Sequence, residues 1–188
     1  MRSLSVFSAV LTAALVLAAC GDLNPLPTAG ISNRTDSLVS VYAVTGTPVT
    51  TPSGYWIFAR QVVRTDLNSV FDFAFDIDSL GRGLLLPTGA LKLGRQSGAQ
   101  LSALAFDSLR VAPSGGYQVD SALVLTVNSV AALHSRSVAC SFDVQPIHNY
   151  FAKLVVLAID TLERRIDFRI LTNINCGYRG LEPGLPHS

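Results

Sequence analysis

Three aspartates at alternate positions of one short segment are the first candidates for chemistry. Asp72, Asp76 and Asp78 fall on one side of the segment 70–78, and large apolar residues occupy the other side. Side chains two positions apart in a strand project from the same face, about 6.5 Å from each other. Carboxylate oxygens at such a spacing could bind a cation.

The match of this segment to a calcium-binding loop is incomplete. Residues 76–78 are followed by a glycine, as such loops require, but Leu80 stands at the third ligand position and Pro87 at that of the bidentate glutamate. We therefore expect a solvated sheet face whose carboxylates oppose arginines of neighbouring strands, such as Arg60 and Arg64. A cation face is the weaker alternative, and we expect no metal and no other cofactor.

The histidines do not predict an active site. Nucleophilic catalysis needs a nucleophile, a base and an orienting group, and no G-x-S-x-G segment marks an exposed nucleophile. His187 stands one residue from the end of the chain. A hydrolase would require His134 or His148 to meet an Asp and a Ser in a cleft. No motif in the sequence indicates such a group, so we do not expect an enzyme.

Two neighbouring aromatic residues, Tyr55 and Trp56, are the candidate ligand or partner patch. Adjacent positions of a strand face opposite sides, so one ring should lie in the core while the other can be exposed. An exposed ring would bind a partner or an apolar molecule. A tryptophan buried beneath the sheet is the alternative.

The first twenty residues resemble the signal peptide of a bacterial lipoprotein. Arg2 precedes an apolar stretch, residues 4–19, which suits a secretory signal and is short for a membrane span. The stretch ends in the sequence LAAC at 17–20, which resembles a lipobox. The resemblance implies that residues 1–19 are removed and that Cys20 is lipidated, so that palmitate-type acyl chains hold the protein on a membrane. A simple signal cleaved after residue 19 would require a small residue at position 17, where Leu stands.

The residues after Cys20 predict location and tether. Gly21 replaces the aspartate that retains lipoproteins in the inner membrane, which favours the outer membrane of the bacterial envelope. Residues 20–37 contain two prolines and no apolar period, so we expect a flexible tether. A formal net charge of +1 gives no footprint for nucleic acid. The expected partners are the membrane and an envelope protein.

The two remaining cysteines, Cys140 and Cys176, predict a disulfide. An exported protein meets an oxidising compartment, where two free thiols most simply pair. The chain-entropy model assigns such a loop about 4 kcal/mol of stabilisation. Free buried thiols, or a metal site with His134 or His148, are the alternatives, although no C-x-x-C pair supports zinc.

Composition and turn signals predict the elements that must position these residues. The 188 residues include only two lysines and two glutamates, and hydrophobic types make up 49%, so strand formers replace charged helix formers. We expect one all-β domain over residues 38–188, an antiparallel β-sandwich or a small β-barrel. The expected strands are 38–45, 55–64, 70–78, 84–86, 98–110, 117–127, 130–138, 150–160 and 166–172.

The last two of these strands form the clearest hairpin, and a short helix around 100–109 is the one exception considered. For function, the sequence favours a membrane-anchored, non-enzymatic binding or scaffold module. A barrel or aromatic end that binds an apolar molecule or a glycan is the alternative, and a hydrolase is a lesser one.

Overall fold

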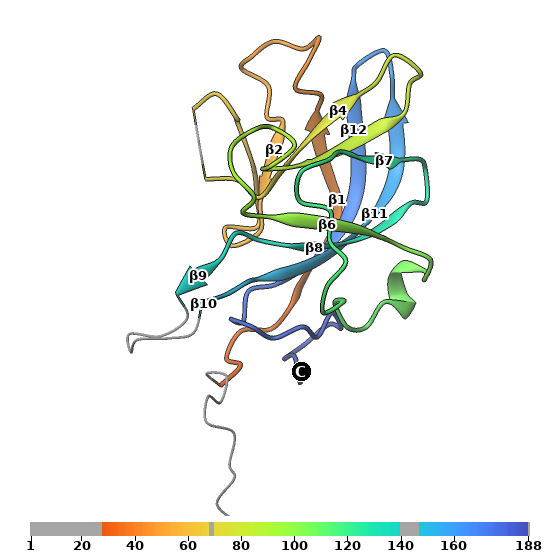
Figure 1. Ribbon diagram of the computed structural model, residues 1–188. Helices are drawn as coiled ribbons and strands as arrows, with labels where there is room; N and C mark the ends of the chain where they lie inside the picture. Colours follow the sequence, from red (N-terminus) through yellow and green to blue (C-terminus); the bar gives the residue numbers. More distant parts are fainter. Residues whose placement is uncertain (1–27, 68–69, 140–146, 188) are drawn as a thin grey trace, which may run out of the picture.

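Two antiparallel five-stranded sheets pack face to face in the computed structural model, which describes residues 28–67, 70–139 and 147–187 (Figure 1). Neither sheet of this described part closes into a barrel. The fold is therefore a single-domain β-sandwich, which confirms the predicted fold class. Within the same residues, no helix has the length and apolar character of a membrane span.

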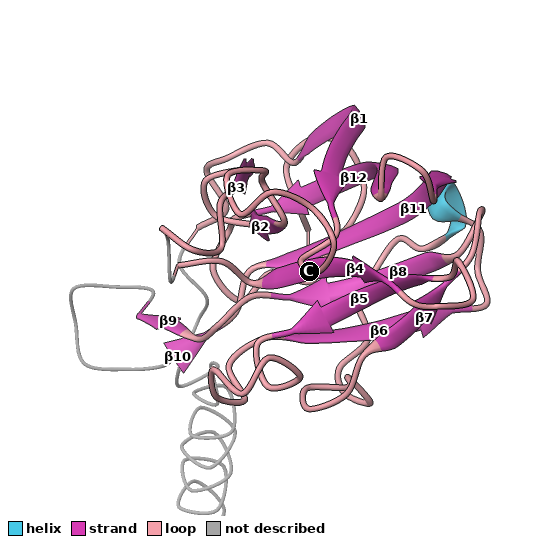
Figure 2. Ribbon diagram, turned by 90° about the horizontal axis from the view of Figure 1, so that it is seen from above, coloured by secondary structure: helices cyan, strands magenta, loops and turns pink. Residues whose placement is uncertain are grey.

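The first sheet has the strand order β1-β12-β11-β8-β6 and the second the order β3-β2-β4-β5-β7. In these orders, the first sheet contains Arg34–Tyr42, Arg165–Asn173, Phe151–Asp160, Val130–His134 and Gly98–Ser102. The second contains Gln61–Val63, Gly54–Trp56, Phe73–Ile77, Gly83–Pro87 and Leu123–Leu125. The short strands β9 (Val138–Ala139) and β10 (Ile147–His148) pair with each other apart from both sheets (Figures 1 and 2). One turn of 3-10 helix, η2, spans Phe106–Ser108.

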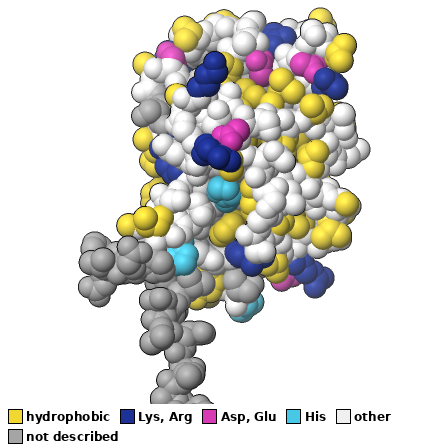
Figure 3. Space-filling view, in the orientation of Figure 1, with side chains coloured by type: hydrophobic (Ala, Val, Ile, Leu, Met, Phe, Trp, Pro, Cys, Tyr) yellow, Lys and Arg dark blue, Asp and Glu magenta, His cyan; other side chains and the backbone are white. Residues whose placement is uncertain are grey.

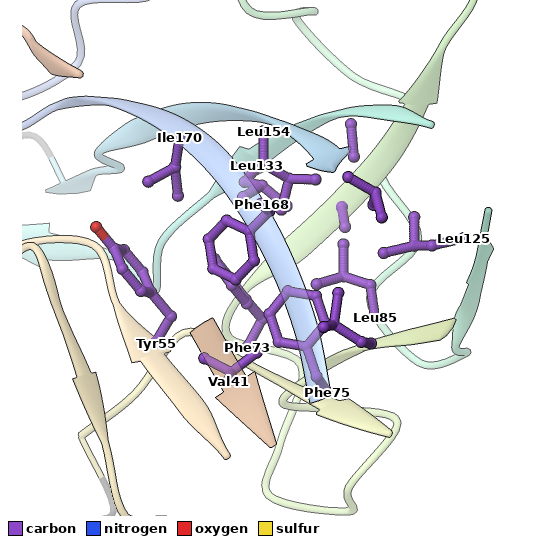
Figure 4. Packing of buried hydrophobic residues seen from close by; sticks show 14 of the residues in the cluster. Val41, Tyr55, Phe73, Phe75, Leu85, Leu125, Leu133, Leu154, Phe168 and Ile170 are labelled. Atoms are coloured by element: carbon purple, nitrogen blue, oxygen red, sulfur yellow. The ribbon is translucent and has the colours of Figure 1, made fainter. Parts of the chain in front are cut away.

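The core between the sheets is built by alternation along the strands. In β4, Phe73, Phe75 and Ile77 point inward, and Phe168 of β12 stacks on Phe75 with 5.1 Å between ring centroids (Figure 4). Leu85, Leu125, Leu133 and Leu154 fill the space around these rings. Side chains thus occupy the interior that a ligand-binding barrel would keep open.

The hairpin of β11 and β12 is the longest element and defines the two ends of the molecule. The hairpin itself was predicted from the sequence, and its register runs from Phe151 opposite Asn173 to Asp160 opposite Arg165. A strand of this length spans about 33 Å. The turn at 161–164 therefore lies at the opposite end of the sandwich from β9 and β10 (Figure 1).

Both sheets are also covered on their outer faces. A second apolar cluster on the first sheet joins Phe106, Leu109 and Leu181 to strand residues such as Ala132. Lys153 holds this cover in place, because its Nζ donates to the carbonyl oxygens of Phe106 at 2.7 Å and Leu109 at 3.0 Å. A third cluster covers the second sheet and consists of Val63, Phe71, Ala74 and Leu86, packed against Trp56, Leu84, Ala90 and Leu91.

Strand β1 begins earlier than the sequence predicts. It starts at Arg34 and pairs with β12, so residues 34–37 are not part of a flexible tether. Asn33 is buried as well, and its Nδ2 donates to the carbonyl oxygens of Gly180 at 3.0 Å and Glu182 at 2.7 Å. Main-chain pairing with β12, rather than an apolar pattern, specifies this part of the strand.

Three other segments form less regular structure than expected. The run 55–64 divides into β2 and β3, because Arg60 adopts a left-handed backbone conformation with φ 56°. The strand expected at 98–110 ends at Ser102, and the helix considered around 100–109 is reduced to η2. The run 117–127 contributes only β7. Each local pattern was too short to outweigh the turn that interrupts it.

We predict that Gly89→Ala destabilises the fold. A Cβ atom at position 89 would overlap the main-chain oxygen of Val119 and lie 2.7 Å from Oδ1 of Asp120. Because backbone atoms yield little, we expect the free energy of unfolding in urea to fall by about 1–3 kcal/mol. Gly115→Ala is the matched control, since nothing lies within 4 Å of its Cβ position. Equal effects of the two changes would contradict the close approach.

Candidate functional site

A buried carboxylate, Asp72, connects the two sheets at one edge of the sandwich. Its side chain is 1% exposed. Oδ2 accepts from the main-chain N–H of Ile57 at 2.8 Å, and Oδ1 accepts from that of Arg136 at 3.0 Å. Ile57 follows β2 of the second sheet and Arg136 follows β8 of the first. The carboxylate therefore fixes the distance between these two chain segments.

The surroundings of Asp72 hold it in place. Ser97 Oγ donates to the main-chain oxygen of Asp72, and Nη2 of Arg136 donates to that of Phe71 at 2.6 Å. Burial raises the pKa of Asp72, and the N–H groups of Arg136 and Ile57 act in the opposite direction. Because both oxygens already accept hydrogen bonds, the geometry assigns this carboxylate a positioning role.

Three aromatic rings stand beside Asp72 and line a cavity of about 200 Å³, which we call the aromatic cavity. Trp56 lies 6.0 Å from Phe58, and Phe58 stacks on Tyr150 at 5.4 Å, measured between ring centroids. The full lining is Trp56, Phe58, Val70, Asp72, Ser135, Arg136, Val138 and Tyr150. Apolar groups dominate the walls, and the lining also includes the polar side chains of Asp72, Ser135 and Arg136.

The walls of the aromatic cavity come from both sheets. Trp56 and Phe58 flank Ile57, whose N–H binds Asp72. On the other side, the N–H of Ser135 donates to the carbonyl oxygen of Tyr150 at 2.9 Å, and the N–H of Tyr150 donates to Ser135 Oγ at 2.9 Å. Ser135 precedes Arg136, so the Asp72 contact sets how far Tyr150 stands from Phe58.

A second cavity of about 370 Å³ shares Phe58 and Tyr150 with the first. We call it the entry cavity, because the first described residues of the chain line it. Its lining consists of Thr28, Gly30, Ile31, Phe58, Ala139, Tyr150, Ile174, Asn175 and Cys176. None of these described residues carries a formal charge.

Strand alternation places Tyr55 and Trp56 as predicted, one in the core and one at the surface. Tyr55 is 1% exposed and stacks on Phe73, so it is not part of a ligand patch. Trp56 is half-buried in the aromatic cavity. Sequence reasoning missed Phe58 and Tyr150 as cavity residues, although Phe58 belongs to the same aromatic run.

The expected acidic face is wrong, because its three carboxylates have different surroundings. Asp72 is buried rather than solvated, and its oxygens accept from main-chain N–H groups. Asp76 accepts from Thr45 Oγ1 at 2.8 Å and from Arg164 Nη2 at 3.1 Å. Asp78 accepts hydrogen bonds from main-chain N–H groups of its own turn. Among the described residues, no three His, Cys, Asp or Glu side chains form a group that could hold a metal.

The arginines expected to face these carboxylates also lie elsewhere. Arg64 pairs with Asp66 at 2.7 Å, and Arg60 donates to the carbonyl oxygen of Ser32 at 3.2 Å. Asp78 instead pairs with Arg82 at 2.7 Å. Local turn geometry, which brings residues two to four positions apart together, decides these ion pairs.

The histidines do not converge with a nucleophile. Nδ1 of His134 lies 2.9 Å from the main-chain oxygen of Ser135, and its ring packs edge-on against Tyr117. Nε2 of His148 is buried with no hydrogen-bond partner among the described residues, and His187 lines a separate cavity near the C-terminus. In this described part, no hydrogen bond joins a histidine to a carboxylate or a hydroxyl.

Cys176 is disulfide-bonded. Its predicted partner Cys140 and the predicted lipidation site Cys20 both lie outside the described residues, so the pairing and the lipidation remain predictions. No protein-family model matches the chain, and no curated protein matches it in a sequence search. The function must therefore be argued from the site itself.

We predict that Asp72→Ala destabilises the protein strongly. The change leaves the N–H groups of Ile57 and Arg136 without their acceptor in a buried position, so the free energy of unfolding should fall by about 3 kcal/mol or more. Asp120→Ala is the control, because Asp120 is 53% exposed in its ion pair with Arg95 and should contribute less than about 1 kcal/mol. Similar losses for both variants would disprove the bridging role.

We also predict that acid weakens the fold through His134. Burial lowers the pKa of His134 below its ordinary value, so between these two pKa values the unfolded chain binds more protons than the folded one. The free energy of unfolding should therefore fall as the pH decreases from about 7 to about 5. Urea titrations at both pH values should show a smaller fall in His134→Gln, and an unchanged one in His187→Gln.

Proposed function

We propose that the chain is a lipid-anchored lipoprotein of the bacterial envelope, most consistent with the outer membrane, and that its sandwich is a non-enzymatic binding module. The LAAC sequence at 17–20 supports the anchor. The aromatic cavity beside Asp72 is the observation that carries the binding function. Its rings stand on a base that is already hydrogen-bonded, so binding requires little reordering of the protein.

The size of the aromatic cavity favours a protein partner. Pockets for drug-sized molecules measure about 300–1,000 Å³, whereas this cavity measures about 200 Å³. That volume suits one ring or one apolar side chain. Protein interfaces concentrate binding energy in such anchor side chains, which enter desolvated pockets lined by aromatic residues. An envelope protein that presents one large apolar side chain fits this description.

The chemistry of the cavity supports binding rather than hydrolysis. Asp72 is the carboxylate in its lining, and both of its oxygens accept main-chain hydrogen bonds. Ser135 Oγ donates to the carbonyl oxygen of Arg136 at 2.6 Å, so this hydroxyl is also engaged. A hydrolase would need a general base in contact with a nucleophile, whereas Asp72 and Ser135 are each hydrogen-bonded to the main chain.

A small apolar or glycan ligand is the second candidate function. The tilted pair of Trp56 and Phe58 offers ring faces on which a planar or sugar ring could lie. The filled core between the sheets leaves this edge cavity, rather than a barrel interior, as its site. The two candidates predict different co-purifying molecules: a protein for the first and a small molecule for the second.

We predict that the acylated protein, extracted in mild detergent, retains a stoichiometric protein companion through the aromatic cavity. Trp56→Ala removes one cavity wall and should weaken the complex at least about tenfold. Because Trp56 is the only tryptophan, the purified companion should also shift its emission to shorter wavelength and protect it from acrylamide. Native mass spectrometry and titration of the emission measure the two effects.

Leu162→Ala is the matched control for this experiment. Leu162 is 93% exposed in the turn between β11 and β12, far from the cavity, so its loss should leave the complex intact. A companion that binds Trp56→Ala as tightly as the wild type would rule out the cavity as the protein-binding site. A small molecule in the native mass, lost in Trp56→Ala, would establish the second candidate instead.

A further inference from the structure

The first described residues of the chain are fixed to the rim of the entry cavity. The side-chain amide of Asn175 accepts through Oδ1 from the N–H groups of Gly30 at 3.1 Å and Ile31 at 3.0 Å, and its Nδ2 donates to the carbonyl oxygen of Ile31 at 2.6 Å. Arg60 binds the carbonyl oxygen of Ser32 from the other side. The point at which the N-terminal chain joins the sandwich is therefore set by hydrogen bonds.

The chain between this point and the predicted anchor is short. Thr28 is eight positions after Cys20, with seven residues between them, and an extended chain advances at most about 3.6 Å per position. A lipidated Cys20 would hold Thr28 within about 29 Å of the bilayer surface. The turn at 161–164 lies at the other end of the long hairpin, so the tether constrains the entry-cavity end most directly.

The entry-cavity end is apolar at its surface. Ile31, Phe58 and Ile147 are 47%, 48% and 64% exposed. Ile31 and Phe58 line the cavity, and Ile147 of β10 lies opposite Ala139 of β9, which also lines it. These three large, exposed apolar side chains lie around one uncharged cavity. A surface of this composition can enter the headgroup region of a bilayer.

The opposite end of the sandwich carries ion pairs in its turns, beside the exposed side chains of Leu80 and Leu162. Around the turn between β11 and β12, Arg164 pairs with Asp76 at 3.1 Å, and Arg165 lies 4.0 Å from Asp160. Arg82 pairs with Asp78 in the neighbouring turn, next to Gly81, whose Cβ position is 3.1 Å from Thr161. Acidic and basic side chains accordingly stand together near the top of the view in Figure 3. Such ion pairs favour water over a bilayer.

We infer that the entry-cavity end faces the membrane and that Ile31, Phe58 and Ile147 contact the lipid surface. The inference rests on the proposed lipid anchor and adds an orientation to it. Tyr150 and Trp56, beside Phe58, then lie at the level where aromatic rings prefer the membrane–water interface. The aromatic cavity opens close to the bilayer, so its partner must present the anchor side chain there.

Trp56 reports on this orientation directly. The experiment uses the full acylated protein in phosphatidylcholine vesicles, prepared with ordinary or with brominated acyl chains. Bromine quenches tryptophan emission on close approach, and Trp56 lies 6.0 Å from the Phe58 ring. We expect brominated lipid to lower the emission of Trp56 at least about twofold, as for a ring at the membrane interface.

Charged substitutions at the two ends provide the comparison. Ile31→Glu and Ile147→Glu each place a carboxylate on an exposed side chain of the entry-cavity end. Each should remove about half or more of the quenching, because a carboxylate disfavours the headgroup boundary. Leu162→Glu places the same charge at the opposite end, where the side chain is 93% exposed. Its quenching should equal that of the wild type.

Flotation and intact mass separate the possible failures. Protein that carries acyl groups on Cys20 and floats with vesicles, but shows equal emission in both lipids, keeps the anchor and overturns the orientation. Equal loss of quenching in Leu162→Glu and Ile147→Glu overturns it as well. An unacylated protein that does not float would refute both the proposed anchor and the orientation drawn from it.

Discussion

The arrangement of the site depends on the buried carboxylate of Asp72, which accepts a hydrogen bond from each sheet. Through Ile57 it places Trp56 and Phe58, and through Arg136 and its neighbour Ser135 it places Tyr150. The Phe58–Tyr150 stack, which forms a wall of both cavities, thus joins segments that β-pairing alone does not hold together. Without this contact, the edges of the two sheets could separate and the cavity would lose its shape.

Burial of the Asp72 carboxylate costs free energy, and the two hydrogen bonds that define the site offset that cost. Taking a carboxylate out of water is costly, and the raised pKa of Asp72 has that burial as its main cause. An apolar residue at position 72 would avoid the cost but leave two buried N–H groups without acceptors. A polar bridge between sheets that are otherwise held by apolar packing is most readily understood as a device that fixes geometry.

The sequence predicted the strands whose apolar alternation was long. It failed where side chains pack on the outer face of a sheet. The β11–β12 hairpin and the inward rings of β4 follow from alternation alone. The same alternation puts Phe71 on the inward face with Phe73 and Phe75, but β4 begins only at Phe73, and Phe71 packs instead with Val63, Ala74 and Leu86 in the third cluster. Phe58 and Tyr150 stand 92 positions apart, so their stacking required the topology of both sheets, which no local pattern contains.

The covering of both outer faces determines where this sandwich can meet other molecules. Phe106 and Leu181 cover part of the first sheet, and Ala90 and Leu91 pack over part of the second, so the chain itself occupies part of each broad face that sandwiches often use for binding. The two ends differ from each other. One end is built from turns whose arginines and aspartates neutralise each other, and such ion pairs favour exposure to water. The other gathers the chain entry, disulfide-bonded Cys176 and the aromatic stack around two cavities. Recognition at that end would couple the binding site to the membrane anchor, because Asn175 and Arg60 bind the N-terminal segment at the rim of the same cavity.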